Sequence, residues 1–152
     1  MKQTILGAGG AIGIELAKSL SQYTSDIRLV SRNPKKVNET DKLFPADLSK
    51  REEVFKAVKD SNITYVVIGF AYQTSVWKEN WPSFIQNVVD ACLEYNSKLV
   101  FFDNVYAIGG NNVKHITESS PISPTSKKGE VRAKVDSIIL ENMATNNLQA
   151  II

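Results

Sequence analysis

The sequence of 152 residues contains one cysteine, one histidine and no long apolar run, and its charges nearly balance. A single cysteine, Cys92, cannot form an intramolecular disulfide, which favours a reducing compartment. No apolar stretch approaches the ~20 residues that a membrane helix requires. The net charge is +2 and basic residues cluster no further than short pairs, so nothing indicates nucleic-acid binding. We therefore expect a cytoplasmic protein that binds neither nucleic acid nor membrane.

Histidine and cysteine, the residues most often used in metal and nucleophilic chemistry, occur once each. His115 lies in a polar stretch, residues 107–125, without an acid or metal ligand at a suitable spacing. We predict no role for it and no metal site. Cys92 shares an apolar stripe at helical spacing with Phe84 and Val88. It is therefore predicted to be a buried structural thiol and not a nucleophile.

Glycine is concentrated near the start of the chain. Residues 4–13 read Thr-Ile-Leu-Gly-Ala-Gly-Gly-Ala-Ile-Gly, a short apolar strand that runs into a glycine-rich turn. Ile12, Leu16 and Leu20 continue at helical spacing and predict a helix over residues 11–22. A strand, a glycine-rich turn and a helix in this order are typical of a nucleotide-binding βαβ unit.

Each glycine of this turn has a physical reason. Gly7 permits a tight turn out of the strand, Gly9 and Gly10 expose backbone N–H groups to a diphosphate, and Gly13 allows close packing of the helix on the sheet. The commoner Gly-x-Gly-x-x-Gly pattern has its third glycine where this chain has isoleucine. The predicted diphosphate ligands are Gly7, Gly9, Gly10, Ala11, Ile12 and Gly13. The alternative is a glycine-rich turn that binds no ligand.

A second strand is predicted at residues 27–31, and Arg32 follows at its tip. In dinucleotide-binding folds this tip lies beside the adenine ribose, where an acidic residue favours NAD and an arginine can hold the 2′-phosphate of NADP. No Asp or Glu occupies the tip. We therefore predict that NADP is preferred, with NAD as a weaker ligand; the alternative is that Arg32 is a solvated surface cation.

Four further strands are predicted, at residues 42–46, 64–70, 98–102 and 148–152, and helices are predicted from Ser49, from Asn80 and over residues 127–145. Ser49 and Glu52 match the Ser-x-x-Glu capping box. Residues 72–80 are expected to be an irregular loop that could line a substrate pocket; the alternative is that Trp77 and Trp81 pack beneath it. The alternation predicts one α/β domain over residues 1–152: a doubly wound, Rossmann-type parallel sheet of about six strands in three α/β/α layers.

Further cofactor contacts are predicted at the carboxyl ends of these strands. Asp47 and Leu48 follow the third strand and are expected beside the adenine ring, although Asp47 could equally decorate a loop. Gly69, Phe70 and Ala71, at the carboxyl end of the strand at 64–70, are expected to pass beside the cofactor, where small residues keep the backbone close to it.

Together these residues resemble the extended and atypical short-chain dehydrogenase/reductase superfamily, in particular its NAD(P)-dependent epimerase/dehydratase group. The resemblance rests on the glycine turn, Arg32, Asp47-Leu48, residues 66–71 and the fifth strand with its following loop. It implies a cofactor of the NADP or NAD type, a small-molecule substrate, and oxidoreductase or epimerase/dehydratase activity. Helices often pair between subunits in this superfamily, so a homo-oligomer is one expectation.

The resemblance also implies catalytic positions. Members of the superfamily carry a serine or threonine after the fifth strand and a Tyr-x-x-x-Lys pair on the next helix. This places Asn104 at the serine position, Lys134 at the lysine position and Glu130 where tyrosine belongs. An ionised glutamate cannot replace a weak phenolic acid. We therefore take Tyr106 as the candidate acid, against the alternative that it packs or binds ribose, and Lys134 as a candidate ligand of the nicotinamide ribose.

Members of this group have a smaller substrate domain after the cofactor domain, so we expect the chain to be the cofactor part of a longer protein; the alternative is a reduced form that only binds its ligand. Two other functions stay open. One is a sensor or regulator that binds NADP(H) without turnover, as the lost tyrosine would permit. The other is an α/β interaction domain whose crevice binds no ligand.

Overall fold

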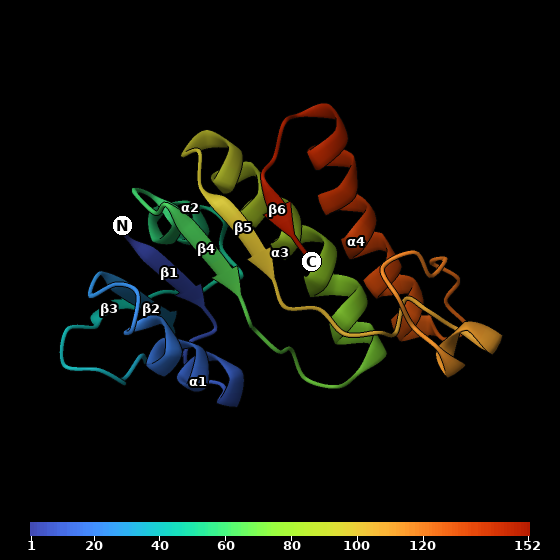
Figure 1. Ribbon diagram of the computed structural model, residues 1–152, viewed down its shortest axis with the longest axis horizontal. Helices are drawn as coiled ribbons and strands as arrows, with labels where there is room; N and C mark the ends of the chain where they lie inside the picture. Colours follow the sequence, from blue (N-terminus) through green and yellow to red (C-terminus); the bar gives the residue numbers. More distant parts are fainter.

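A computed structural model describes residues 1–152, in which strands and helices alternate along the chain (Figure 1). The strands are β1 Gln3–Leu6, β2 Ile27–Ser31, β3 Lys42–Pro45, β4 Ile63–Val66, β5 Lys98–Phe101 and β6 Ala150–Ile151. The helices are α1 Ala11–Leu20, α2 Arg51–Val58, α3 Thr74–Glu94 and α4 Lys127–Thr145, with a 3₁₀ turn, η1, at Gly110–Lys114. No helix is both long and apolar enough to cross a membrane.

The six strands form one parallel sheet in the order β3-β2-β1-β4-β5-β6. Strand β1 lies at the centre, where Ile5 is in register with Leu29 of β2 and with Tyr65 of β4. The chain moves outward from β1 first to one side and then to the other, which makes the sheet doubly wound. The predicted fold class is confirmed, and the order reverses between β1 and β4, the usual position of a ligand crevice in such sheets.

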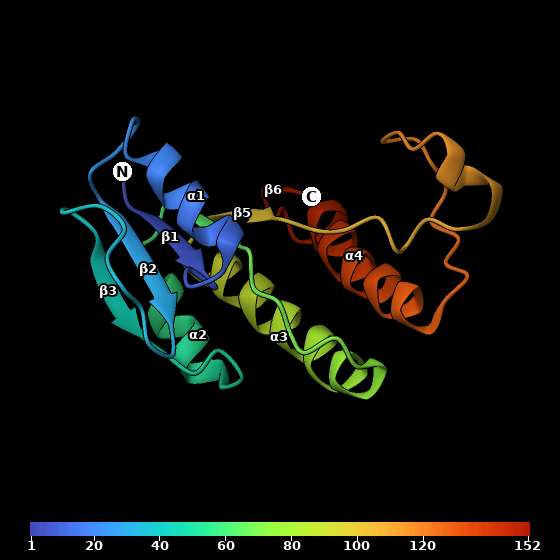
Figure 2. The same cartoon turned by 90° about the horizontal axis from the view of Figure 1, so that it is seen from below.

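Helices cover the two faces of the sheet unequally (Figure 2). Alternate residues of the central strands point to opposite faces: Leu6 and Val30 join the large core with α2, α3 and α4, whereas Ile5 and Leu29 join a smaller core with α1. Helix α4 packs beside α3. The three predicted layers are therefore present, with α1 alone on its face.

Helix α3 corrects the expectation of an irregular loop at residues 72–80. The helix begins at Thr74, so Pro82 lies inside it and not at its start. An internal proline removes one backbone hydrogen bond. Trp77 and Trp81, four residues apart, are both buried on the core side and continue the stripe of Phe84, so packing offsets that loss.

Two boundaries also differ from the sequence prediction. Helix α2 begins at Arg51 without a side-chain cap, so the predicted capping box of Ser49 and Glu52 does not form. The hydroxyl of Ser49 instead donates to the carboxylate of Asp47 at 2.7 Å. Strand β4 ends at Val66, four residues before the predicted end, and residues 67–70 belong to no regular element, although the N–H of Val67 still donates to Leu6 of β1 at 3.0 Å.

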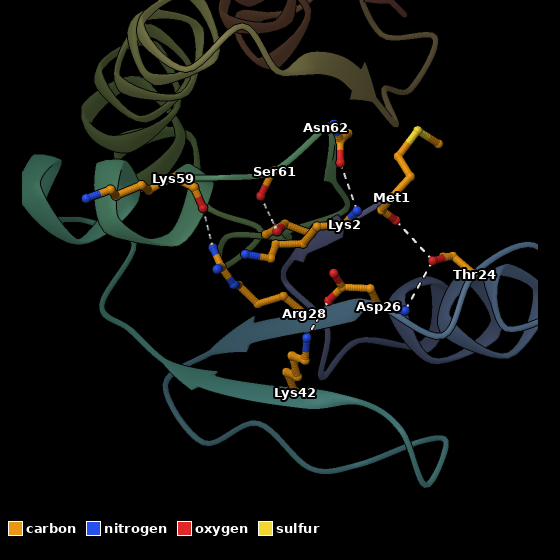
Figure 3. Close-up of polar contacts among 10 residues, drawn as sticks. Met1, Lys2, Thr24, Asp26, Arg28, Lys42, Lys59, Ser61 and Asn62 are labelled. Atoms are coloured by element: carbon orange, nitrogen blue, oxygen red, sulfur yellow. Dashed lines mark hydrogen bonds and ion pairs between the residues drawn. The ribbon is translucent and has the colours of Figure 1, made fainter.

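A network of polar contacts joins the elements at the amino edge of the sheet (Figure 3). The backbone N–H of Lys2 donates to the Asn62 side chain at 2.8 Å. Arg28 donates through Nη1 to the carbonyls of Ala57 and Lys59, at 2.6 and 2.9 Å, and so caps the carboxyl end of α2. These contacts hold α2 to the strands at the edge opposite the crevice.

The Arg28 cap generates a prediction about stability. Replacing Arg28 by Met keeps an apolar stem but leaves two carbonyls of the α2 end without their charged donor. We expect Arg28→Met to lower the free energy of unfolding by about 1–3 kcal/mol in urea denaturation. Lys42→Met, which breaks an exposed pair with Asp26 on the same edge, is the control and should cost no more than about 1 kcal/mol. Equal losses in the two variants would contradict the capping role.

Candidate functional site

The turn after β1 lies against the backbone that leaves β4. Gly7 has φ +95°, a left-handed conformation that favours glycine, and a Cβ there would lie 2.7 Å from the backbone of Ile68. The N–H groups of Gly7 and Ala8 donate to the carbonyl of Val30 at 3.0 and 3.1 Å. Both contacts fix the turn over the point where the strand order reverses.

The start of α1 presents free donors at this turn. Gly10 donates to Gly7, but the N–H groups of Gly9, Ala11, Ile12 and Gly13 have no acceptor within the protein. Unpaired N–H groups at a helix N-terminus favour an anion. Gly13 brings the helix close, since a Cβ there would lie 2.8 Å from Cα of Ala8. The corner is thus neither filled by side chains nor closed by internal hydrogen bonds.

A cavity of about 560 Å³ opens beside this turn at the carboxyl edge of β1, β2, β3 and β4. Eight residues predicted to lie at the cofactor line it: Gly7, Gly9, Gly10, Arg32, Asp47, Leu48, Gly69 and Phe70. Ala11, Ile12, Gly13, Ala71 and Lys134 do not. Five lining residues were not predicted: Ser31, Ala46, Ser49, Val67 and Ile68. Their common signal is position, since each adjoins the carboxyl end of a strand.

The β2 and β3 ends give the cavity a charged rim. Arg32 is exposed and forms no ion pair, so its guanidinium is available to a ligand. Asp47 accepts hydrogen bonds from the backbone and hydroxyl of Ser49, which lower its pKa, as do the charges of Lys50 and Arg32 to a smaller extent. The Asp47 carboxylate therefore accepts hydrogen bonds mainly from its own turn.

Of the three predicted catalytic residues, Asn104 and Tyr106 lie together and Lys134 lies apart. Asn104 uses its side-chain oxygen to accept the backbone N–H of Tyr106 at 3.0 Å. Tyr106 lies beside Tyr72, with the two hydroxyl oxygens 3.3 Å apart. Lys134 and Glu130 share an exposed face of α4 and line no part of the cavity. The contact of Lys134 with the cofactor stays a prediction; helix packing turns a different face of α4 inward.

The inward face of α4 carries Lys128 and Arg132, which the sequence analysis did not select. Arg132 is 2% exposed, forms an ion pair with Asp103 just after β5, and lies 4.2 Å from the ring centre of Trp81. Burial lowers the pKa of Arg132 to about 10, opposed by the charge of Asp136. The available signal was an arginine directly beside the apolar stripe of Val131 in a predicted helix.

Cys92 is buried, as its place in the apolar stripe predicted. Burial raises the pKa of its thiol to about 12, with hydrogen bonds to Thr64 and Ser97 acting in the opposite direction. A thiol without thiolate character is a poor nucleophile. This residue therefore serves packing.

The glycine turn generates a second prediction. Gly7→Ala forces a side chain into a left-handed conformation and against the Ile68 backbone, so we expect a loss of about 2–4 kcal/mol in the free energy of unfolding. Gly69→Ala is the matched control: a Cβ at Gly69 meets nothing within 4 Å, and the expected change is within about 0.5 kcal/mol. Urea denaturation measures both, and a Gly7 variant as stable as the Gly69 variant would refute the close approach.

Asp136 generates a third prediction. Burial raises its pKa from 3.8 to about 6, although Arg132 opposes the shift. The folded state then binds more protons than the unfolded state, so this group's contribution to stability falls as pH rises from 3.8 to about 6. We expect Asp136→Asn to remove that part of the pH dependence of unfolding in urea. Glu130→Gln, on the exposed side of the same helix, is the control. Parallel pH profiles for wild type and Asp136→Asn would contradict the assignment.

A family model described as the NAD dependent epimerase/dehydratase family matches residues 4–152. Uronate dehydrogenase from Agrobacterium tumefaciens has a TM-score of 0.85 at 14% identity, over 98% of this chain and 58% of that chain. UDP-N-acetylglucosamine 4-epimerase from Bacillus cereus has a TM-score of 0.81 at 17% identity, and the match covers 99% of this chain and 51% of that chain. L-threonine dehydrogenase from Clostridium difficile has a TM-score of 0.80 at 20% identity, and the match covers 95% of this chain and 49% of that chain.

The chain therefore spans between 49% and 58% of the length of these three solved structures. At such low identities the likeness concerns the fold. No curated protein matches the chain in sequence.

Proposed function

Since the chain belongs to the NAD dependent epimerase/dehydratase family, we propose that its cavity binds a nicotinamide dinucleotide, with NADP preferred over NAD. The observation that carries the proposal is the group of four unpaired amides, at Gly9, Ala11, Ile12 and Gly13, beside a cavity of about 560 Å³. An anionic diphosphate would accept hydrogen bonds from such amides. This extends the site to Ala11, Ile12 and Gly13, which lie next to the cavity wall.

The other lining residues fit the remaining parts of a dinucleotide. Arg32 stands at the rim with no competing ion pair, and its fork of donors suits a 2′-phosphate. The adenine would lie near Asp47 and Leu48, the latter buried at the cavity wall. Phe70 and Ala71 would border the nicotinamide end, where the chain from β4 passes the crevice.

We propose an oxidoreductase or epimerase/dehydratase-like reaction on a small molecule held over the carboxyl ends of β4 and β5. The bound nicotinamide would supply or accept the hydride. Tyr106 is the candidate proton donor, because its hydroxyl lies at this edge and 39% of the residue is exposed. Asn104 keeps its side-chain NH₂ for a substrate, since only its oxygen is used in the turn. Lys134 is omitted from the site because it lies on the exposed face of α4.

A sensor that binds NADP(H) without turnover is the second candidate. The observation that favours it is the exposed Glu130 at the position where the resemblance placed a tyrosine.

Fluorescence titration of the purified chain with NADPH tests the proposal directly. Saturable binding, accompanied by oxidation of NADPH with an aldehyde, ketone or sugar nucleotide, supports the enzyme. Binding without turnover on any of these compounds favours the sensor. A folded protein that binds neither NADPH nor NADH would refute the dinucleotide site.

The role of Arg32 generates a fourth prediction. Arg32→Ala should weaken NADPH binding by about 10- to 100-fold, the value of one charge-assisted contact, and change NADH binding little. Lys35→Ala, which removes an exposed cation three residues away, is the control and should leave both affinities unchanged. Equal losses for NADPH and NADH in Arg32→Ala would exclude a contact to the 2′-phosphate.

A further inference from the structure

Lys128, in the first turn of α4, is held against the segment that follows β4. Its Nζ lies 3.1 Å from the ring centre of Tyr72 and 5.7 Å from that of Trp77. The same ammonium donates to the backbone carbonyl of Tyr72 at 3.2 Å. A lysine over an aromatic face is stabilised by the ring quadrupole, and this one has further N–H donors left for a ligand.

Tyr72 connects this ammonium to Tyr106. The two tyrosine hydroxyl oxygens lie 3.3 Å apart, and the Tyr106 ring stacks on Trp77 with a centroid distance of 6.1 Å. The hydrogen bond with Tyr72 raises the pKa of Tyr106 above its ordinary 10.0, while the charge of Lys128 acts in the opposite direction. The Tyr106 phenol therefore keeps its proton at neutral pH, within the field of a fixed cation.

The fold fixes this arrangement from the α4 side. Gly129 touches the loop after β5, since a Cβ there would collide with the carbonyl of Tyr106. One turn later, the buried Arg132 is paired with Asp103, which follows β5 directly. These two contacts place Lys128 at the carboxyl edge of the sheet. Figures 1 and 2 show the start of α4 near the segments that leave β4 and β5.

The group formed by Lys128, Tyr72, Trp77 and Tyr106 continues the wall of the cavity. Phe70 lines the cavity, and its ring contacts Trp81 with a centroid distance of 4.8 Å. Trp81 contacts Trp77, and Trp77 contacts both tyrosines. Tyr72 and Tyr106 are 66% and 39% exposed, so a small molecule at the cavity mouth can reach them.

We propose that Lys128 and Tyr106, joined by Tyr72, are the proton-donating group of this site, with a carbonyl compound as the substrate; this rests on the function proposed above. Lys128 and Arg132 have the four-residue spacing that the resemblance assigned to Glu130 and Lys134, but on the inward face of the helix. Arg132, at the second of these two positions, is a buried structural cation. The proton donor, Tyr106, comes instead from the loop after β5.

Reduction of a carbonyl compound requires one hydride and one proton, and Tyr106 and Lys128 serve the proton transfer. In reduction of a carbonyl, a bound reduced dinucleotide would supply a hydride to the carbon, and the oxygen would gain a proton. The O–H bond of Tyr106 breaks, the new O–H bond forms on the substrate oxygen, and a phenolate is left on Tyr106. The ammonium of Lys128 stabilises that phenolate until water returns the proton.

Titration of tyrosine ionisation by difference absorbance tests the coupling without any substrate. Tyr106→Phe identifies the Tyr106 transition, because it removes one tyrosine and keeps the ring. We expect Lys128→Met to move this transition to higher pH by removing the nearby cation, and Lys127→Met, the exposed neighbour, to leave it in place. A Tyr106 transition that does not move in Lys128→Met would overturn the proposal.

Turnover and cofactor binding in the same variants separate this proposal from the general function. NADPH affinity should be unchanged in Lys128→Met and Tyr106→Phe, whereas reduction of carbonyl compounds by NADPH should fall by about 10²- to 10⁴-fold in Tyr106→Phe. Loss of NADPH binding in Lys128→Met would assign that lysine to the cofactor. A wild-type chain that binds NADPH but reduces no aldehyde, ketone or keto sugar overturns the proton-donating group alone, and one that binds no NADPH refutes the dinucleotide site itself.

Discussion

The close approach of two backbones, the turn after β1 and the chain leaving β4, is the constraint on which the rest of the site depends. Gly7 makes it possible, because any side chain there would meet the backbone of Ile68. With the turn in contact with β4, Gly13 can place the first turn of α1 against Ala8. The free amides of α1 are then aimed across the sheet edge at the reversal of strand order, and the cavity follows from this position.

A second constraint acts at the other side of the crevice, where α4 is held by a buried charge pair. Arg132 and Asp103 lose hydration on folding, a cost that the ion pair and the faces of Trp81 and Phe101 offset only in one geometry. The pair therefore contributes more to the position of α4 than to stability. Because α4 starts beside the loop after β5, this position determines which of its side chains reach the carboxyl edge.

Much of the cofactor side could be predicted because glycine and apolar runs act locally. The β1 turn, the parallel sheet and the placement of Arg32 at the tip of β2 all follow from short patterns. Spacing alone could not decide which face of α4 turns inward. Lys134 and Arg132 both border the apolar stripe, and only packing against β5 selects Arg132.

Two further misses have local causes. The start of α3 was placed too late because Pro82 is a common first-turn residue, whereas here the buried pair of Trp77 and Trp81 extends the helix on the amino-terminal side of the proline. The capping box failed because α2 begins at Arg51 with Lys50 at the N-cap position, so Ser49 lies one residue before the cap, where its hydroxyl donates to Asp47. In each case a tertiary or neighbouring contact outweighed a valid local signal.

The burial of both tryptophans side by side has a practical consequence. Trp77 and Trp81 lie with ring centres 6.2 Å apart, next to the guanidinium of Arg132. The tryptophan emission of the chain thus originates in one corner between α3, β5 and α4. Any change in that emission can be assigned to this corner without an attached label.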